Sequence, residues 1–179
     1  MSKPPSGLFR GTAGEREFRG NAEEVIASRV AGLDLRAHPL TQEQLSFKQR
    51  KEIKKKIAAR TATKEEYKRS EWQRRLDARR KKGSDDFWDH ERALLEEGLG
   101  GTRNWSQEQR DAILMGKKPR YNGRVLEAHH TYSVKLFPHL ANHWEVIYPA
   151  THFEHRYGWH GGNSKASLPG RRIRIINEM

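Results

Sequence analysis

The sequence contains no cysteine, which excludes disulfide bonds, thiolate zinc sites and thiol nucleophiles together. Long apolar runs are also missing. None approaches the roughly 18 residues of a membrane span, and the first residues have no signal-peptide core. Hydrophobic residues make up only 34% of the chain and charged residues 32%, so part of the chain should lie outside any tight core. A transition metal, if one is bound, must be held by histidine and carboxylate.

Positive charge is concentrated in one segment of the chain. The 35 Lys and Arg outnumber the 23 Asp and Glu, and residues 48–82 alone hold 16 of the first kind and 5 of the second. This excess is larger than solubility requires and favours a polyanion, above all the phosphate backbone of nucleic acid. The alternative is a solvated helical hairpin. The residues expected to contact nucleic acid are Lys54, Lys55, Lys56, Arg74, Arg75, Arg79 and Arg80.

The histidines lie elsewhere, since seven of the nine fall between His129 and His160. This separation of charge from imidazole divides the chain into three predicted parts. Residues 1–40 form a loosely structured lead-in with a short helix around 22–30, and residues 41–98 form a basic helical segment. Residues 102–179 form the histidine-rich domain. The glycine-rich stretch 98–101 predicts a flexible connection between the last two parts.

Capping patterns locate the helices of the basic segment. Thr41 with Gln44, and Thr63 with Glu66, match the capping box and predict two helix starts. Gly83 reads as the stop of the second helix, and a third helix is expected from residue 84 or 85 to residue 98.

The histidine-rich part predicts a small α+β domain. A capping box at Ser106 opens a short helix, and the pair Asn122-Gly123 favours a tight turn. Strand-like runs follow at residues 125–130 and 144–148, with Pro149 ending the second. A further capping box at Thr151 opens another short helix. The order of strand, loop, strand and helix is too short for a parallel sheet.

A strand that ends in two histidines and a helix that begins with two more can bring these side chains together. Three neutral imidazoles can bind one divalent ion and leave a coordination position open. A fourth imidazole, with a pKa near neutrality, can act as general base on water. Such a site predicts metal-assisted phosphodiester hydrolysis, with the basic segment supplying affinity for the substrate.

Three motifs carry a family resemblance: Leu126-Glu127-Ala128-His129-His130, Pro138-His139-Leu140-Ala141-Asn142, and the run 154–163. Together they resemble the HNH (ββα-metal, His-Me finger) nucleases. More closely, they are similar to the C-terminal toxin domains of bacterial polymorphic and contact-dependent toxins, relatives of the DNase colicins. The resemblance covers roughly residues 105–170. It implies that one divalent ion (Zn²⁺, Ni²⁺ or Mg²⁺) is bound by His129, His155 and His160, that His130 is the general base, and that Asn142 tethers a loop and orients that base.

One feature departs from the family pattern. The helix histidines of the family are usually four residues apart, whereas His155 and His160 are five apart. In an α-helix this spacing turns the two side chains about 140° away from a common face. A bend at Gly158 could recover the geometry. Otherwise His152 and His155 would form the pair, and His160 would contact phosphate.

The expected function is a metal-dependent endonuclease that cleaves DNA with weak sequence specificity. The resemblance further implies a toxin that is secreted or delivered from the producer cell, acts in the cytoplasm of a target bacterium, and is neutralised by a cognate immunity protein. One alternative is an RNase with the same metal site. Another is a non-catalytic nucleic-acid-binding module in which a histidine–metal site is purely structural.

Overall fold

The structure is a computed structural model, and it describes residues 21–177. These residues form an α+β fold of helices and small antiparallel sheets, as the sequence predicts. In chain order the elements are α1 (Ala22–Val30), α2 (Phe47–Ala58), α3 (Lys64–Glu96), α4 (Gln107–Leu114), β1 (Arg120–Tyr121), β2 (Arg124–Val125), β3 (Glu127–His130), η1 (Pro138–Leu140), η2 (Trp144–Val146), β4 (Ile147–Ala150) and η3 (Glu154–Trp159). Within the described range, no helix combines the length and the apolar character that a bilayer crossing requires.

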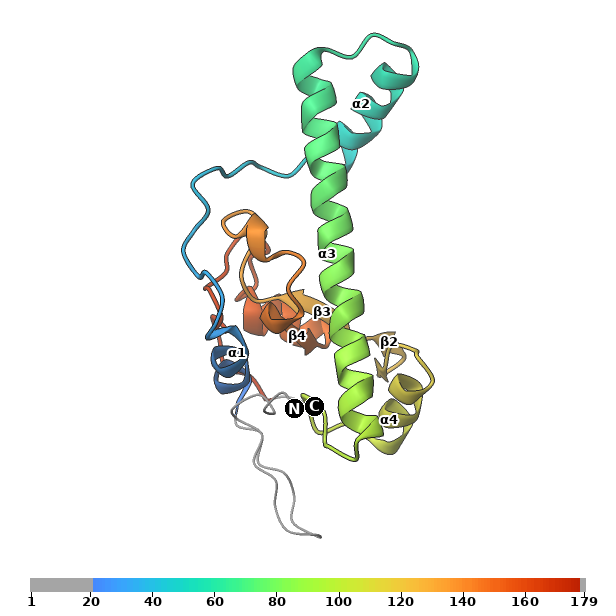
Figure 1. Cartoon of the computed structure of the whole chain (residues 1–179), viewed down its shortest axis with the longest axis vertical. Coiled ribbons are helices and arrows are strands. Elements are labelled where there is room, and N and C mark those ends of the chain that lie inside the picture. The colour runs from blue at the N-terminus through green and yellow to red at the C-terminus, as the bar shows by residue number, and fades with distance from the viewer. Residues whose placement is uncertain (1–20, 178–179) are drawn as a thin grey trace.

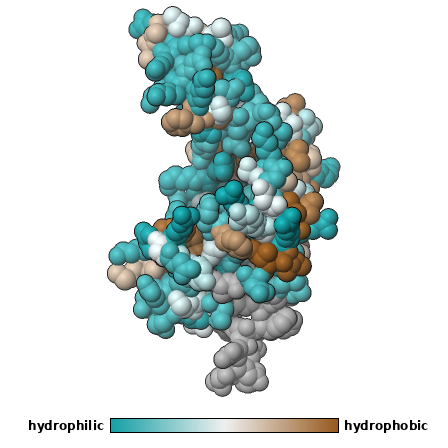
Figure 2. All heavy atoms as spheres, turned by 180° about the vertical axis from the view of Figure 1, so that it is seen from behind, coloured by the Kyte–Doolittle hydropathy of each residue, from teal (hydrophilic) through white to brown (hydrophobic). Residues whose placement is uncertain are grey.

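Helix α3 is the axis of the molecule, and its first half pairs with α2 to form a hairpin that projects beyond the rest (Figure 1). A polar network joins the two helices. The Gln73 side chain accepts a hydrogen bond from the Leu45 amide at 2.8 Å, and Arg50 pairs with Asp77 at 2.6 Å. Figure 2 shows that the projecting end is mostly hydrophilic, while hydrophobic side chains gather on the lower body. The hairpin, residues 47–82, is called the basic arm below.

Two predicted boundaries in the arm are wrong. Helix α2 begins after Ser46, which forms a capping box with Gln49, and not after Thr41. Helix α3 begins at the expected capping box of Thr63, but it continues through Gly83 as one helix of 33 residues. No third helix starts at residue 84, because the glycine is buried inside α3 against another part of the chain.

The core lies around the second half of α3. Phe87 of α3 packs with Ile26 of α1, Ile147 of β4 and Trp159 of η3, all at most 2% exposed. The predicted helix at residues 22–30 is confirmed and belongs to this core. The stretch 98–101 is no loose connection, since Leu99 is buried and Gly101 closely approaches the buried Glu91 carboxylate.

The turn and strands that lead to the histidines are largely as expected. Asn122 and Gly123 both adopt positive φ, 46° and 76°, as the predicted tight turn requires. The expected strand 125–130 is interrupted at Leu126 into β2 and β3. The expected strand 144–148 is wrong at both ends: residues 144–146 form a 3₁₀ helix, and the second strand, β4, runs from Ile147 to Ala150, so that Pro149 lies within the strand and does not end it. Strands β3 and β4 pair antiparallel, and the following helical segment supplies the remaining histidines.

Candidate metal centre and catalytic pocket

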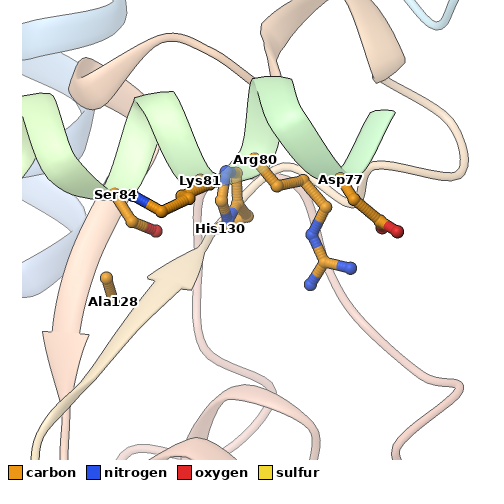
Figure 3. Close-up of a pocket in the computed structure, with 6 residues that line it drawn as sticks. All are labelled: Asp77, Arg80, Lys81, Ser84, Ala128 and His130. Carbon is orange, nitrogen blue, oxygen red and sulfur yellow. The ribbon is translucent and has the colours of Figure 1, made fainter. Parts of the chain in front are cut away.

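Strand β3 presents different chemistry on its two faces. Successive side chains of a strand point to opposite sides, so Glu127 and His129 share one face while Ala128 and His130 share the other. The first face lies toward η3. The second lies against α3, as Figure 3 shows for Ala128 and His130. Adjacent histidines of one short strand therefore enter two separate environments.

The spacing of five residues between His155 and His160 is accommodated by a π-helix. Helical structure begins at His152 and becomes π-helical at residues 154–159. Its hydrogen bonds connect residues five apart, and the His160 amide donates to the His155 carbonyl at 3.1 Å. This wider turn brings the two imidazoles onto a common face. Gly158 is not in the left-handed region, so the π-helix, and not a bend at that glycine, recovers the geometry.

The start of this helical segment is fixed by a reciprocal cap and a buried ion pair. Thr151 and Glu154 exchange side chain–backbone hydrogen bonds at 2.8 and 3.2 Å, which confirms the predicted capping box. The Glu154 carboxylate also pairs with Arg103 at 2.6 and 2.8 Å, and Arg103 donates to the Pro149 carbonyl. These contacts fasten the histidine-bearing helix to the end of β4.

Three imidazoles converge between β3 and η3. Ring nitrogens of His129, His155 and His160 all lie within 4.8 Å of one another, and the Nε2 atoms of His155 and His160 are 3.1 Å apart. Adjacent nitrogens of a tetrahedral zinc site, with bonds of about 2.0–2.1 Å, lie about 3.3 Å apart. The donor set and its spacing therefore fit one divalent ion.

The outer nitrogens of two of these rings are occupied by hydrogen-bond acceptors. His155 Nδ1 contacts the Glu127 carboxylate, and His160 Nδ1 donates to the Ala166 carbonyl at 2.7 Å. With Nδ1 protonated, each Nε2 carries a lone pair directed at the shared centre. The His129 ring packs against Trp159, with ring centroids 4.9 Å apart.

Burial favours the neutral form of His129 and His155. Burial lowers the pKa of His129 well below its usual range, and the nearby imidazoles His155 and His160 lower it further. Burial also lowers the pKa of His155, although the Glu127 carboxylate opposes that shift. Because neutral imidazole is the form that binds a metal, these side chains are ready to act as ligands at neutral pH.

His152 stands outside the cluster of three. Its side chain is half exposed, and its Nδ1 lies 3.1 Å from the second oxygen of Glu127. Partial burial tends to raise the pKa of Glu127, but hydrogen bonds from His152 and His155 outweigh it and lower the pKa. The geometry thus groups His160, and not His152, with His155. The Glu127 carboxylate contacts both His152 and His155. Its place in the site could have been predicted from the sequence, because Glu127 and His129 are two residues apart and so lie on the same face of the strand.

On the other face, His130 is directed toward α3. Its Nε2 lies 2.8 Å from the Ala141 carbonyl, so the neutral ring donates there and leaves Nδ1 as the acceptor. Burial lowers the pKa of His130 to about 4; the hydrogen bond to Ala141 opposes this shift, and the positive charge of Arg80 adds to it. The imidazole is therefore neutral at physiological pH and has a lone pair on Nδ1, but its pKa lies below the near-neutral value expected of a general base, because the ring is buried and close to Arg80.

His130 lines a small pocket of 260 Å³ between β3 and α3 (Figure 3). Helix α3 contributes side chains one turn apart to this pocket, and Arg80 also reaches the adjoining cleft of 1400 Å³ that contains the three clustered histidines. The Asp77 carboxylate in the pocket is already paired with Arg50. A phosphate could thus lie beside His130 and still be close to the histidine cluster.

Asn142 lies next to the contact that orients His130 but does not make it. Its Oδ1 accepts a hydrogen bond from Arg79 at 2.8 Å, and the same Arg79 nitrogen donates to the His139 carbonyl. The hydrogen bond to His130 comes from the backbone of Ala141. The resemblance assigned both tethering and orienting to Asn142; in the structure its side chain tethers, and the preceding carbonyl orients.

The seven basic residues expected to contact nucleic acid fall into distinct groups. Lys56 is paired with Glu66 at 2.6 Å and Arg74 with Glu71 at 3.0 Å, while Arg79 holds the loop of Asn142. Arg80 lines the pocket of His130. Of these seven, Lys54, Lys55 and Arg75 are exposed and form no ion pair with the residues that the structure describes.

A strand pair followed by a helix, with three imidazoles clustered between them, is the arrangement of a candidate ββα-metal centre. Residues 70–151, just under half of the chain, match the family model described as a GHH-signature-containing HNH/Endo VII superfamily nuclease toxin. That family is one of nuclease toxins, its superfamily is metal-dependent, and a nuclease acts on nucleic acid. Comparison with curated proteins and with solved structures found no match.

The family match covers only part of the candidate site. It begins inside α3 and ends at Thr151, so it includes His129 and His130 but neither His155 nor His160. The chain has a single His-His pair, and Ala128 precedes it where the name of the signature has glycine. The grouping of the helix histidines with His129 therefore rests on the geometry of this chain.

Proposed function

We propose that the chain is a metal-dependent endonuclease that hydrolyses phosphodiester bonds of DNA with weak sequence preference. The observation that carries the proposal is the division of β3. A neutral His130 with an open Nδ1 faces a basic pocket, and three clustered imidazoles lie across the same strand. A general base and a metal site are thereby held side by side without sharing ligands.

In the proposed hydrolysis, His130, Arg80 and the three clustered histidines have different roles. His130 Nδ1 accepts a proton from water, whose oxygen attacks phosphorus while the bond to the leaving oxygen breaks on the opposite side. Arg80 neutralises charge on the phosphate. A divalent ion held by His129, His155 and His160 would supply Lewis-acid stabilisation of the charge that develops during cleavage.

The nitrogen-only donor set favours Zn²⁺ or Ni²⁺ over Mg²⁺, since Mg²⁺ prefers oxygen ligands. DNA is proposed as the substrate because the histidine motifs resemble those of the DNase colicins, and the proposed nucleophile, water, allows cleavage of DNA. Attack by water needs no 2′-hydroxyl, so it serves a DNA strand as well as an RNA strand. The exposed cations of the basic arm support binding through phosphates, which carries little sequence information.

Plasmid nicking tests the proposal. Supercoiled DNA and total RNA are incubated in parallel with the wild type and with His130→Ala, over a panel of divalent ions and with a chelator. We expect metal-dependent nicking of DNA that the variant lacks. Cleavage of RNA alone would identify an RNase instead. Binding of both nucleic acids without any cleavage by the wild type would identify a non-catalytic module.

We further propose that the domain acts in the cytoplasm of a target bacterium after delivery, and that an immunity protein protects the producer. The toxin family supports this role. Expression of the wild type in bacteria should stop growth, and His130→Ala should not. Co-expression of the cognate immunity protein should restore growth, and that protein should inhibit nicking by the purified chain; harmless wild-type expression would contradict the role.

A further inference from the structure

Gly83 occupies an unusual position for a glycine. It lies well inside α3, 19 residues after the first residue of the helix and 13 before the last, and it is buried. Glycine is the poorest helix former after proline, because the unfolded chain loses the most backbone freedom at this residue. Its presence inside a long helix therefore requires a compensating role in packing or function.

The surroundings of Gly83 supply that role. A Cβ atom at this position would lie 2.6 Å from the Ala141 carbonyl oxygen and 3.3 Å from the Asn142 backbone. The first distance is far below any tolerated contact, and the atoms concerned are backbone atoms, which cannot swing aside as a side chain can. Only glycine lets the loop of residues 139–142 come this close to α3.

The same carbonyl oxygen is the one that holds His130. Ala141 is 1% exposed, and its oxygen lies 2.8 Å from His130 Nε2. One helical turn before Gly83, Arg79 binds the same loop through the His139 carbonyl and the Asn142 side chain, at 2.9 and 2.8 Å. Helix α3 thus holds the loop of residues 139–142 in position at two successive turns. The loop in turn holds the His130 ring in position through the Ala141 carbonyl.

We propose that Gly83 is a positioning residue for His130: by admitting the Ala141 carbonyl close to α3, it fixes the imidazole so that Nδ1 faces the pocket. The inference rests on the proposed role of His130 as general base. Figure 3 shows His130 beside the side chains of α3 that share its pocket. Arg80, Lys81 and Ser84 of α3 line the same pocket as His130. One helix therefore sets the position of the base and of the groups that would bind phosphate.

The test is Gly83→Ala, assayed with the full chain. A misplacement of the order of 1 Å at a reacting group can lower a rate about 100-fold, so we expect kcat to fall roughly 10- to 100-fold. KM for DNA and the affinity for Zn²⁺ alone, measured by calorimetry, should stay within about threefold of wild type. The ring ¹⁵N signals of His130 should show a changed balance between its tautomers. Gly32→Ala is the matched control, because nothing lies within 4 Å of a Cβ there.

The outcomes separate this inference from the proposed function. If His130→Ala still cleaves DNA, the general-base role is wrong. If His130→Ala is inactive but Gly83→Ala keeps the wild-type kcat and His130 spectrum, the positioning role of Gly83 is wrong. If Gly83→Ala does not fold, Arg79→Gln decides, since it loosens the same loop without a clash. It should lower kcat about threefold to tenfold and change the same His130 signals, and an unchanged spectrum would overturn the inference.

Discussion

The two faces of β3 differ in what surrounds them more than in their own residues. His129 and His130 are adjacent and both buried enough to be neutral, yet one meets imidazoles from η3 and the other meets a carbonyl and the cations of α3. The role of each histidine therefore follows from its neighbours across the strand. A ligand needs lone pairs converging on one point, and a base needs one occupied nitrogen and one open nitrogen.

This comparison also explains how one short strand can carry both tasks. The alternation of a strand separates adjacent side chains without any extra structure. Each face then has its own support: Glu127 and the π-helix on one side, and the Ala141 carbonyl and Gly83 on the other. Substitutions on one face should leave the other intact, and the predictions below test that separation.

The largest effect is expected from the adjacent histidines themselves. His130→Ala should lower kcat by roughly 100- to 10,000-fold, the usual contribution of a general base, while the affinity for Zn²⁺ stays near wild type. His129→Ala should lose the metal as well as the activity. Calorimetric titration with Zn²⁺, alongside the nicking assay, distinguishes the two. Metal loss in His130→Ala would mean that the two roles are exchanged.

A smaller effect, confined to the metal face, is expected for Glu127→Gln. The carboxylate accepts from His155 Nδ1, and losing such a partner typically weakens metal binding 10- to 100-fold. At saturating Zn²⁺ the kcat should largely recover. Glu108→Gln, on exposed α4, is the control. A large loss of kcat that excess metal does not repair would show that Glu127 acts on the reaction itself.

Local patterns predicted the parts of the site that depend on neighbours in the chain. The capping boxes at Thr63, Ser106 and Thr151 and the turn at Asn122 each require residues only a few positions apart, and all are present. The strand pair and the helix after it also follow from local hydrophobic and capping signals. These elements were enough to predict that the histidines would meet.

The missed features depend on contacts far along the chain. Taken from the local sequence, Gly83 predicts the end of a helix. The helix continues because the glycine packs against the carbonyl of Ala141, 58 residues later in the chain. The π-helix could not be read from spacing, because the same five residues are equally compatible with a bend at Gly158. Ala141 acts through its backbone, which leaves no signature in its side chain.

A third prediction concerns the arm, which lies away from both faces. Replacing Lys54, Lys55 and Arg75 with Gln should raise KM and leave kcat at saturation unchanged, because these exposed cations would contact only flanking phosphates. If all three make such contacts, the slope of log binding constant against log salt should fall by about 3. Lys56→Gln with Arg74→Gln is the matched control, since both cations are already paired. Equal effects of the two sets would mean that general charge, and not individual contacts, binds the substrate.

The smallest effect is expected for the pH dependence of the free energy of unfolding, to which His90 contributes independently of the β3 histidines. His90 of α3 stacks on Trp144 with ring centroids 3.8 Å apart, and burial, with the charge of Arg29, lowers its pKa to about 4. The unfolded chain protonates near pH 6.5 while the folded chain resists, so the free energy of unfolding should fall as the pH falls from about 6.5 to about 4. His90→Phe keeps the stacking and removes this term, which should flatten the pH dependence of urea unfolding. The buried histidines of β3 contribute in the same direction, so part of the dependence should persist; a variant that unfolds with the same pH dependence as wild type would show that His90 titrates normally.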